Sequence, residues 1–190
     1  MKVVQSLALA GMIGLGSLYG ADYKVDTSHS DIGFKVKHMM ISNVKGNFEQ
    51  FSGSFTLDKK TKIFSKIDGS VEVATLTTQD AKRDGHLKSP DFFDVKKYPQ
   101  MKFKLLEHKG DSVRVELSIK DVTKVVTMRV EDISGTVKDP WGNTKVAFEI
   151  RGEINRKDFH MNFSQLLETG GLLVDDRVKF DIVIEGIEVK

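Results

Sequence analysis

The stretch VRVELSIK, residues 113–120, alternates apolar and polar side chains from end to end. Successive side chains of a β-strand point to opposite faces, so this segment would have one apolar face and one polar face. Strands of a parallel sheet that is covered on both sides read instead as continuous apolar runs. Residues 113–120 therefore predict a strand of an antiparallel sheet with one face in water.

The same two-residue alternation recurs along most of the chain. It is found in residues 32–37, 53–58, 67–73, 101–105, 125–131, 145–154 and 178–184. About eight such strands in one domain form a sandwich or a closed barrel, and an eight-stranded barrel has room for side chains or one small ligand. Gly53 and Gly152 fall on apolar faces, where a glycine opens space or lets a strand bend. This combination favours an all-β fold, an eight-stranded antiparallel barrel with a cavity.

Three segments interrupt the strands. Thr77-Thr78-Gln79-Asp80 resembles a capping box and predicts a short helix that runs to Lys88. Residues 89–93 predict a second turn, capped by a serine and with proline at its first position. Residues 162–168 predict one or two helical turns that end at a pair of glycines. We expect one or two of these short helices to lie at the rim of the cavity.

The N terminus has the features of a secretory signal peptide. Lys2 provides a positive charge, residues 7–18 are apolar or small, and small side chains follow at Gly20 and Ala21. The apolar run is short and rich in glycine for a membrane-spanning helix. We predict that residues 1–21 are a signal peptide cut after Gly20 or Ala21, that residues 22–190 form one domain, and that the protein is periplasmic or secreted.

Composition argues against several classes of function. The 190-residue chain has no cysteine, which removes disulfides, thiol catalysis and thiolate metal sites. Its formal net charge is only +2 and the charges are interleaved, so no basic stripe points to nucleic acid. The five histidines lack recognised metal-ligand spacing, and no G-x-S-x-G nucleophile motif is present. We expect no metal, no cofactor and no nucleic-acid partner, and we do not expect an enzyme.

The segment RDGHLKSPDFFDVKKYPQMKF, residues 83–103, combines many charges with aromatic rings. This composition suits the rim of an apolar cavity that holds a hydrophobic molecule at one polar end. Its polar residues are candidates for contacting a head group; alternatively, Arg83 and Asp84 pair with neighbouring strands and His86 fastens the helix to the barrel. Twelve phenylalanines against one tryptophan and three tyrosines favour an apolar lining, although core packing explains many of them equally well. The predicted ligand-binding residues are Phe34, Val36, Phe48, Phe55, Arg83, Asp84, His86, Phe92, Phe93, Met101, Phe103, Phe148, Ile150 and Phe180.

A series of ordered motifs runs through the chain. The strongest are RDGHL at 83–87, DFFDV at 91–95 and KYP at 97–99; the others are YKVD at 23–26, HSDIGFKVKH at 29–38, VKGNF at 44–48, FSG at 51–53, DVTKVV at 121–126, DPWG at 139–142 and INRKDF at 154–159. Together they resemble the YceI-like family of exported, lipocalin-like, polyisoprenoid-binding barrels. The resemblance covers essentially all of residues 22–190 and implies a long apolar tunnel for a polyprenyl or long-chain lipid. The chain departs from the family pattern at His160-Met161, where a glycine is usual. We expect this departure to alter the cavity wall or its entrance.

These observations lead to one main functional hypothesis. We expect an exported binding protein that sequesters or carries an amphiphilic isoprenoid, quinone-like or polyprenyl, or a long-chain fatty lipid. Two alternatives stay open: a periplasmic enzyme that acts on a cavity-bound lipid, and a partner that delivers quinone to a membrane redox protein. A homodimer also stays open, because the sequence does not address the oligomeric state.

Overall fold

The computed structural model describes residues 20–168 and 171–189. Within them the strands are β1 (Ala21–Val25), β2 (Asp31–His38), β3 (Ser42–Phe48), β4 (Phe51–Leu57), β5 (Phe64–Glu72), β6 (Leu76–Thr77), β7 (Gln100–Lys109), β8 (Ser112–Ile119), β9 (Val122–Glu131), β10 (Val137–Lys138), β11 (Thr144–Asn155) and β12 (Val174–Glu188). One α-helix, α1 (Ala81–Lys88), and two 3₁₀ turns, η1 (Val73–Thr75) and η2 (Arg156–Phe159), complete the fold. The predicted signal peptide lies outside the described residues up to position 19, and β1 begins at Ala21.

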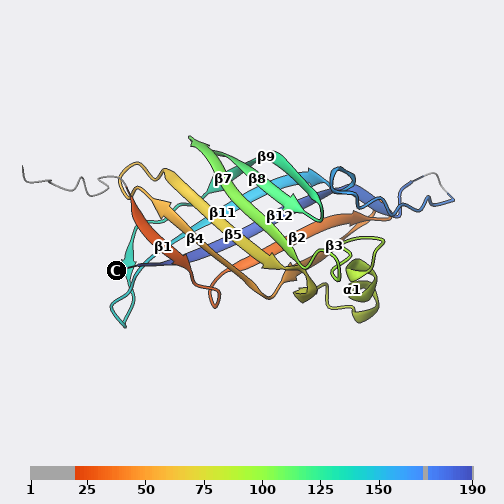
Figure 1. The fold of residues 1–190 in the computed structure, drawn as a ribbon, viewed down its shortest axis with the longest axis horizontal. Helices are drawn as coiled ribbons and strands as arrows, with labels where there is room; N and C mark the ends of the chain where they lie inside the picture. The colour runs from red at the N-terminus through yellow and green to blue at the C-terminus, as the bar shows by residue number, and fades with distance from the viewer. Residues whose placement is uncertain (1–19, 169–170, 190) are drawn as a thin grey trace, which may run out of the picture.

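Eight of the strands close into an antiparallel barrel. Neighbouring strands pair in the order β1, β4, β5, β7, β8, β9, β11 and β12, and β12 pairs with β1 again to close the ring. The barrel is elongated, with α1 at one end and the C terminus at the other (Figure 1). The predicted fold class, an eight-stranded antiparallel barrel with a short helix at its end, is confirmed.

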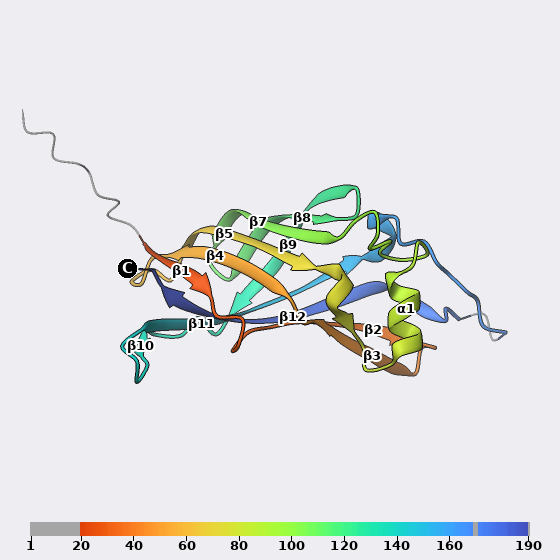
Figure 2. The same cartoon turned by 60° about the horizontal axis from the view of Figure 1, so that its bottom comes forward.

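The long strand β12 joins the barrel to a side extension. It pairs with β11 along most of its length, while its other edge pairs first with β2 and then with β1. Strands β3 and β6 follow β2 outwards and extend the wall at the end of the barrel where α1 lies (Figure 2).

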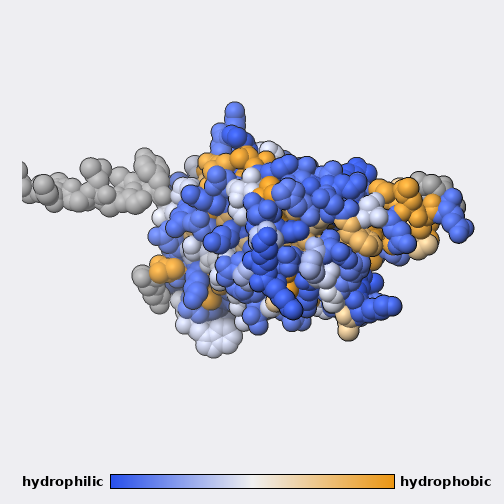
Figure 3. All heavy atoms as spheres, turned by 45° about the vertical axis from the view of Figure 1, so that its right-hand side comes forward, coloured by the Kyte–Doolittle hydropathy of each residue, from blue (hydrophilic) through white to orange (hydrophobic). Residues whose placement is uncertain are grey.

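Burial follows the alternation that predicted the strands. In β8 the side chains of Val113, Val115 and Leu117 are buried, whereas Arg114 is exposed. All eight predicted segments are strands. The face of the molecule drawn in Figure 3 is mostly hydrophilic, and its hydrophobic atoms gather mainly at the top and at the projecting right-hand end. Among the helices of the described residues, none is long and apolar enough to cross a membrane.

The predicted helix that starts at the Thr77–Asp80 box is correct only in its second half. Thr77 pairs with Asn47 as part of β6, and Gln79 has a φ of 62°, which interrupts a helix. Asp80 is the N-cap, because its side chain accepts a hydrogen bond of 3.0 Å from the Arg83 backbone N–H. The helix therefore begins at Ala81. The predicted turn after Ser89 is present as a hydrogen-bonded turn, since the Ser89 carbonyl accepts the backbone N–H groups of Phe92 and Asp94.

The predicted helical turns over residues 162–168 are wrong. In a helix, the Phe163 carbonyl would accept the Leu167 N–H. Instead, that carbonyl accepts the guanidinium of Arg156, and the Leu167 N–H donates to the Gly171 carbonyl. A bridge between Leu166 and Leu172 makes this loop a narrow, extended excursion.

Candidate functional site

The barrel interior contains two apolar cavities that follow one another along its axis. The inner cavity, of about 100 Å³, lies between β4, β5, β7, β11 and β12, and the rim cavity, of about 60 Å³, lies at the end that carries α1. Met101 and Phe180 line both, so these two side chains form the partition between them. The surface of each cavity is almost wholly apolar.

Every apolar residue of the predicted ligand-binding set lines one of these cavities. Phe55, Phe103, Phe148 and Ile150 line the inner cavity; Phe34, Val36, Phe48, Phe92 and Phe93 line the rim cavity; Met101 and Phe180 line both. Their contact with a ligand stays a prediction, but their placement around these two adjoining apolar cavities is a property of the fold.

Two glycines create the inner cavity. Gly53 of β4 and Gly69 of β5 are directly paired and lie on the same strand faces as the inward-facing residues Phe55 and Ile67. Without side chains at these positions, the wall is thin and the space in front of it stays empty. The sequence-based expectation that Gly53 opens space on an inner face is correct.

An aromatic cluster lies beyond the inner cavity, on the side away from α1. Tyr23 stacks on Phe55 with ring centroids 5.0 Å apart, Phe148 meets Phe55 edge-on at 5.0 Å, and Phe64 lies 4.6 Å from Phe148. All four side chains are buried. The apolar space therefore stops at this cluster, and its other end lies towards α1.

The segment after α1 covers that end. Phe93 meets Phe48 edge-on with centroids 6.1 Å apart, and Phe92 packs 5.2 Å from Phe163 of the long loop. His86 lies edge-on to both Phe92 and Phe163. Phe92 and Phe93 thus lie at the rim cavity, with Phe92 more deeply buried than expected for a mouth residue, and their role at a ligand entrance stays a prediction.

The predicted head-group residues Arg83, Asp84 and His86 line neither cavity. Arg83 donates from Nε to Thr78 Oγ1 at 2.7 Å, and Asp84 accepts the Thr78 N–H at 2.8 Å. Burial raises the pKa of Asp84, but the hydrogen bonds from Thr78 outweigh it and hold this pKa below its ordinary value. Arg83 and Asp84 thus fix α1 to Thr78, directly after β6, which is close to the alternative that they pair with neighbouring strands. His86 contacts Asp91 at 3.0 Å and lies against the rim.

Arg156 is a site residue that sequence reasoning missed. Its side chain is 2% exposed and borders the rim cavity. Its guanidinium donates to the carbonyls of Met161, Phe163 and Asp175 at 2.6, 2.6 and 3.0 Å and to the Asp176 carboxylate at 2.9 Å. Burial lowers the pKa of Arg156, and the neighbouring carboxylates oppose that shift. The only signal in the sequence was its place in the INRKDF motif.

The pair His160-Met161, which is expected to alter the cavity wall or its entrance, lies at the end of η2 next to the rim cavity. His160 has a φ of 57°, in the left-handed region where a glycine is favoured. Met161 is 4% exposed, and its side chain lines the rim cavity. The chain therefore keeps the turn without the glycine and places a flexible side chain in the wall of the cavity.

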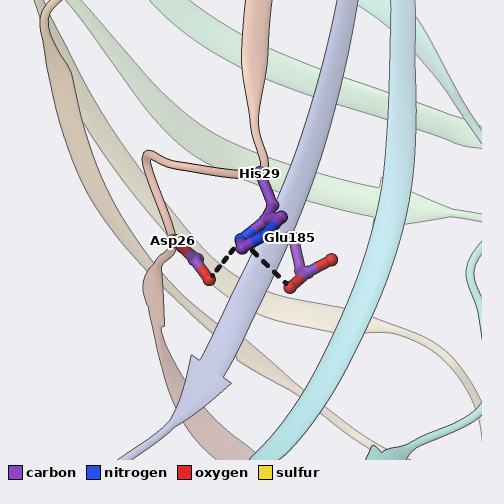
Figure 4. Close-up of side chains that lie close together, drawn as sticks. All are labelled: Asp26, His29 and Glu185. Carbon is purple, nitrogen blue, oxygen red and sulfur yellow. Dashed lines mark hydrogen bonds and ion pairs between the residues drawn. The ribbon is translucent and has the colours of Figure 1, made fainter. Parts of the chain in front are cut away.

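Asp26, His29 and Glu185 converge outside the barrel interior (Figure 4). His29 Nδ1 lies 3.0 Å from Asp26 Oδ2 and 3.9 Å from Glu185 Oε1. The Lys145 ammonium lies between the two carboxylates, 2.9 Å from Asp26 and 2.7 Å from Glu185. The hydrogen bond from Lys145 lowers the pKa of Asp26 to about 2, and that to Glu185 raises the pKa of Lys145. The Lys145 ammonium therefore already occupies the place between the two carboxylates that a metal ion would take.

Comparison with known proteins assigns the family. The YceI-like domain matches residues 23–186. The chain belongs to the YceI-like family. The family resemblance predicted from the motifs is thereby confirmed over residues 23–186.

Relatives in this family share both length and fold. Protein YceI of Escherichia coli O157:H7 is 34% identical over 185 residues, which cover 94% of this chain and 93% of that protein. The crystal structure of the Campylobacter jejuni YCEI protein matches with a TM-score of 0.70 at 34% identity, over 87% of this chain and 96% of that chain. A polyisoprenoid binding domain from Saccharophagus degradans matches with a TM-score of 0.63 at 14% identity, over 88% and 98% of the two chains. At that identity the likeness shows the shared fold.

Proposed function

We propose that this protein binds the apolar tail of an amphiphilic isoprenoid, quinone-like or polyprenyl, or of a long-chain fatty lipid, and sequesters or carries it. The observation that supports this most is the pair of apolar cavities that follow one another from Gly53 and Gly69 to the rim and are separated by Met101 and Phe180. The Saccharophagus degradans polyisoprenoid binding domain shares this fold, which supports the same ligand class.

The tail alone supplies enough affinity for such a role. Burial of one methylene contributes about 0.8 kcal/mol, so ten of them contribute about 8 kcal/mol. That corresponds to roughly micromolar binding before the cost of ordering the chain is subtracted. The polar groups at the rim then have to select the head group rather than provide the affinity.

Binding requires the interior to expand. Ligand pockets usually measure about 300–1,000 Å³, whereas the two cavities measure about 100 and 60 Å³. We propose that Met101 and Phe180 swing aside when a tail enters, because they form the partition, and that Phe93 moves at the rim. Methionine suits this role, since its unbranched side chain adopts several shapes at low cost.

Among the three predicted head-group residues, we assign the head contact to His86. Its ring lies 5.1 Å from that of Phe92, which lines the rim cavity. Its Nε2 lies 3.0 Å from Asp91, in an exposed pair that a polar head can reach.

The decisive experiment is to purify the protein from its native host, extract it with organic solvent, and analyse the extract by mass spectrometry. We expect one polyprenyl or long-chain species in stoichiometric amount. A clean extract, together with failure to take up polyprenyl and fatty-acid probes, would show that the barrel is simply filled by its own side chains.

We also propose that the chain is exported and that cleavage after Gly20 or Ala21 leaves it in the periplasm. Ala21 is paired with Leu57, so a cut after Gly20 leaves β1 whole, whereas a cut after Ala21 removes one paired residue. Measuring the intact mass of the protein in the periplasmic fraction tests this proposal. Recovery of the shortened protein from the medium would show instead that it is released from the cell. A full-length mass in the cytoplasm would contradict export.

A further inference from the structure

Large apolar side chains are exposed together at the α1 end of the barrel. The turn between β2 and β3 exposes Met39, Met40 and Ile41, the last two by 54% and 81%, and the long loop exposes Leu166 by 70%. We name these four residues the apolar tip. Figure 3 shows hydrophobic atoms gathered at the projecting end of the molecule.

The turn and the loop form one surface. The Met39 N–H donates to the Leu173 carbonyl at 2.9 Å, which ties the turn to the far side of the loop. A Cβ atom placed on Gly171 would lie 3.4 Å from Met40 Cγ and 3.7 Å from Leu167 Cδ1. The apolar tip is therefore a single packed projection rather than two separate loops.

The turn displays its methionines in an unfavourable backbone conformation. Met39 and Met40 have φ angles of 50° and 63°, in the left-handed region that glycine and asparagine occupy most readily. With the hydrogen bond of 3.2 Å from the Ile41 N–H to the His38 carbonyl, these angles make a type I′ hairpin turn, where asparagine and glycine are usual and two exposed methionines are not. Strain of this kind concentrates at functional sites.

A row of basic side chains lies behind the apolar tip. Lys45, Lys35 and Lys179 are direct neighbours across β3, β2 and β12. Like charges in directly opposed positions destabilise a sheet, which an anionic partner would relieve. Glu153 lies 3.8 Å from Lys179, but Lys35, Lys37 and Lys45 form no ion pair with any residue that the structure describes. Lys37 lies two residues from the turn.

The apolar tip adjoins the entrance to the cavities. Val36 precedes the turn by three residues and lines the rim cavity, as does Val174, which directly follows the loop and pairs with His38. A membrane or partner bound at the apolar tip would therefore lie close to the rim cavity.

We infer that this end of the protein docks on an anionic phospholipid surface, with the apolar tip inserted among the acyl chains and Lys35, Lys37 and Lys45 against the head groups. An apolar wedge backed by basic residues is the combination that holds proteins at membrane interfaces. The docking itself follows from the surface; its use in loading the barrel rests on the proposed function.

Sedimentation with vesicles tests the docking. Vesicles of phosphatidylcholine alone and with roughly one-third phosphatidylglycerol are incubated with the wild type and with a Met40→Asp/Ile41→Asp variant, both with N termini verified by intact mass. We expect binding to the anionic vesicles and a loss of about tenfold or more in the variant. Lys35→Glu/Lys45→Glu should weaken binding to the anionic vesicles by about fivefold per charge, with little effect on neutral ones.

Leu106→Asp is the matched control. Leu106 is 45% exposed in β7, outside the apolar tip, so this variant should bind as the wild type does. Equal binding by the wild type and the Met40→Asp/Ile41→Asp variant, or no binding by either, would overturn the inference. A dimer in light scattering that this variant converts to a monomer, without vesicle binding, would assign the apolar tip to a second copy of the chain. Lipid content of the same preparations is measured separately, so failure to dock and failure to hold a lipid are distinguished.

Discussion

Gly53 and Gly69 lie directly opposite each other on β4 and β5, and neither sends a side chain into the barrel. The inner cavity lies in front of this pair. The two positions are not equivalent, because a Cβ on Gly53 would lie 2.9 Å from the Asp68 carbonyl oxygen, whereas a Cβ on Gly69 meets only the Ser52 carbonyl oxygen at 3.6 Å. A side chain can therefore be introduced at Gly69 without moving the backbone.

Gly69→Leu should abolish lipid binding while the protein still folds. The four carbons of the new side chain would occupy most of the inner cavity of about 100 Å³. Lipid content after organic extraction and the thermal unfolding midpoint check the two halves of the prediction. Gly135→Leu is the control, because Gly135 is exposed and a Cβ atom placed on it would meet no other atom within 4 Å. Full lipid content in Gly69→Leu would place the ligand elsewhere.

Arg156→Met should destabilise the fold by about 3 kcal/mol, because it removes the donor shared by four carbonyls and leaves Asp176 without its guanidinium. For a domain of this size the thermal midpoint should fall by roughly 6–12 °C. The thermal midpoint of Arg156→Lys should lie between those of the wild type and Arg156→Met, since one ammonium cannot reach all of these acceptors. Arg177→Met serves as the comparison, because Arg177 is 67% exposed and its ion pairs are 3.9 Å long. Equal midpoints for Arg156→Met and Arg177→Met would refute this role.

The strands were predictable because their alternation reflects burial on one face, a local property. The exceptions are informative. In β3, SNVKGNF, the inward position 46 is a glycine, since a Cβ there would lie 2.5 Å from the Phe34 ring. The strand thus lacks an apolar residue where alternation requires one. The glycine at this position is required by the Phe34 ring on the neighbouring strand, and the local sequence of β3 cannot reveal that contact.

The apolar lining was predictable for the same reason, because in a barrel the inward face of a strand is the wall of the cavity. The roles of the polar residues were harder to predict from the sequence. Arg83 and Asp84 suggested a head-group site by composition, yet their polar atoms bind Thr78 five and six residues earlier. Arg156 acts through carbonyls up to 19 residues away. Roles of this kind depend on how distant segments meet.

Lys145→Met should reduce the acid sensitivity of the fold. The pKa of Asp26 is about 2 in the folded protein, below its ordinary value of 3.8, chiefly because of the hydrogen bond from Lys145. A carboxyl with a lowered pKa stabilises the fold above its unfolded pKa and loses this contribution as the pH falls through its folded pKa. The wild type should therefore lose stability between about pH 4 and pH 2 more steeply than the variant.

Urea unfolding at a series of pH values from 6 to about 2.5 measures this slope. Arg114→Met is the control, since the ion pair of Arg114 with Glu107 is half exposed on both sides and contributes little. Parallel pH profiles for the wild type and Lys145→Met would show that the Asp26 carboxyl is not stabilised by the ammonium.

Tyr23→Phe should leave stability unchanged or raise it by up to about 1 kcal/mol. Tyr23 is fully buried, and its hydroxyl has no hydrogen-bond partner among residues 20–168 and 171–189. A buried hydroxyl without a partner costs free energy, and burial correspondingly raises the pKa of Tyr23. The substitution keeps the ring that stacks on Phe55 at 5.0 Å. Tyr23→Leu, which removes that stacking, should by contrast lower the urea midpoint. If Tyr23→Phe destabilises the protein as much as Tyr23→Leu does, the hydroxyl has a partner, and a bound water or the nearby Lys59 ammonium would be the first to examine.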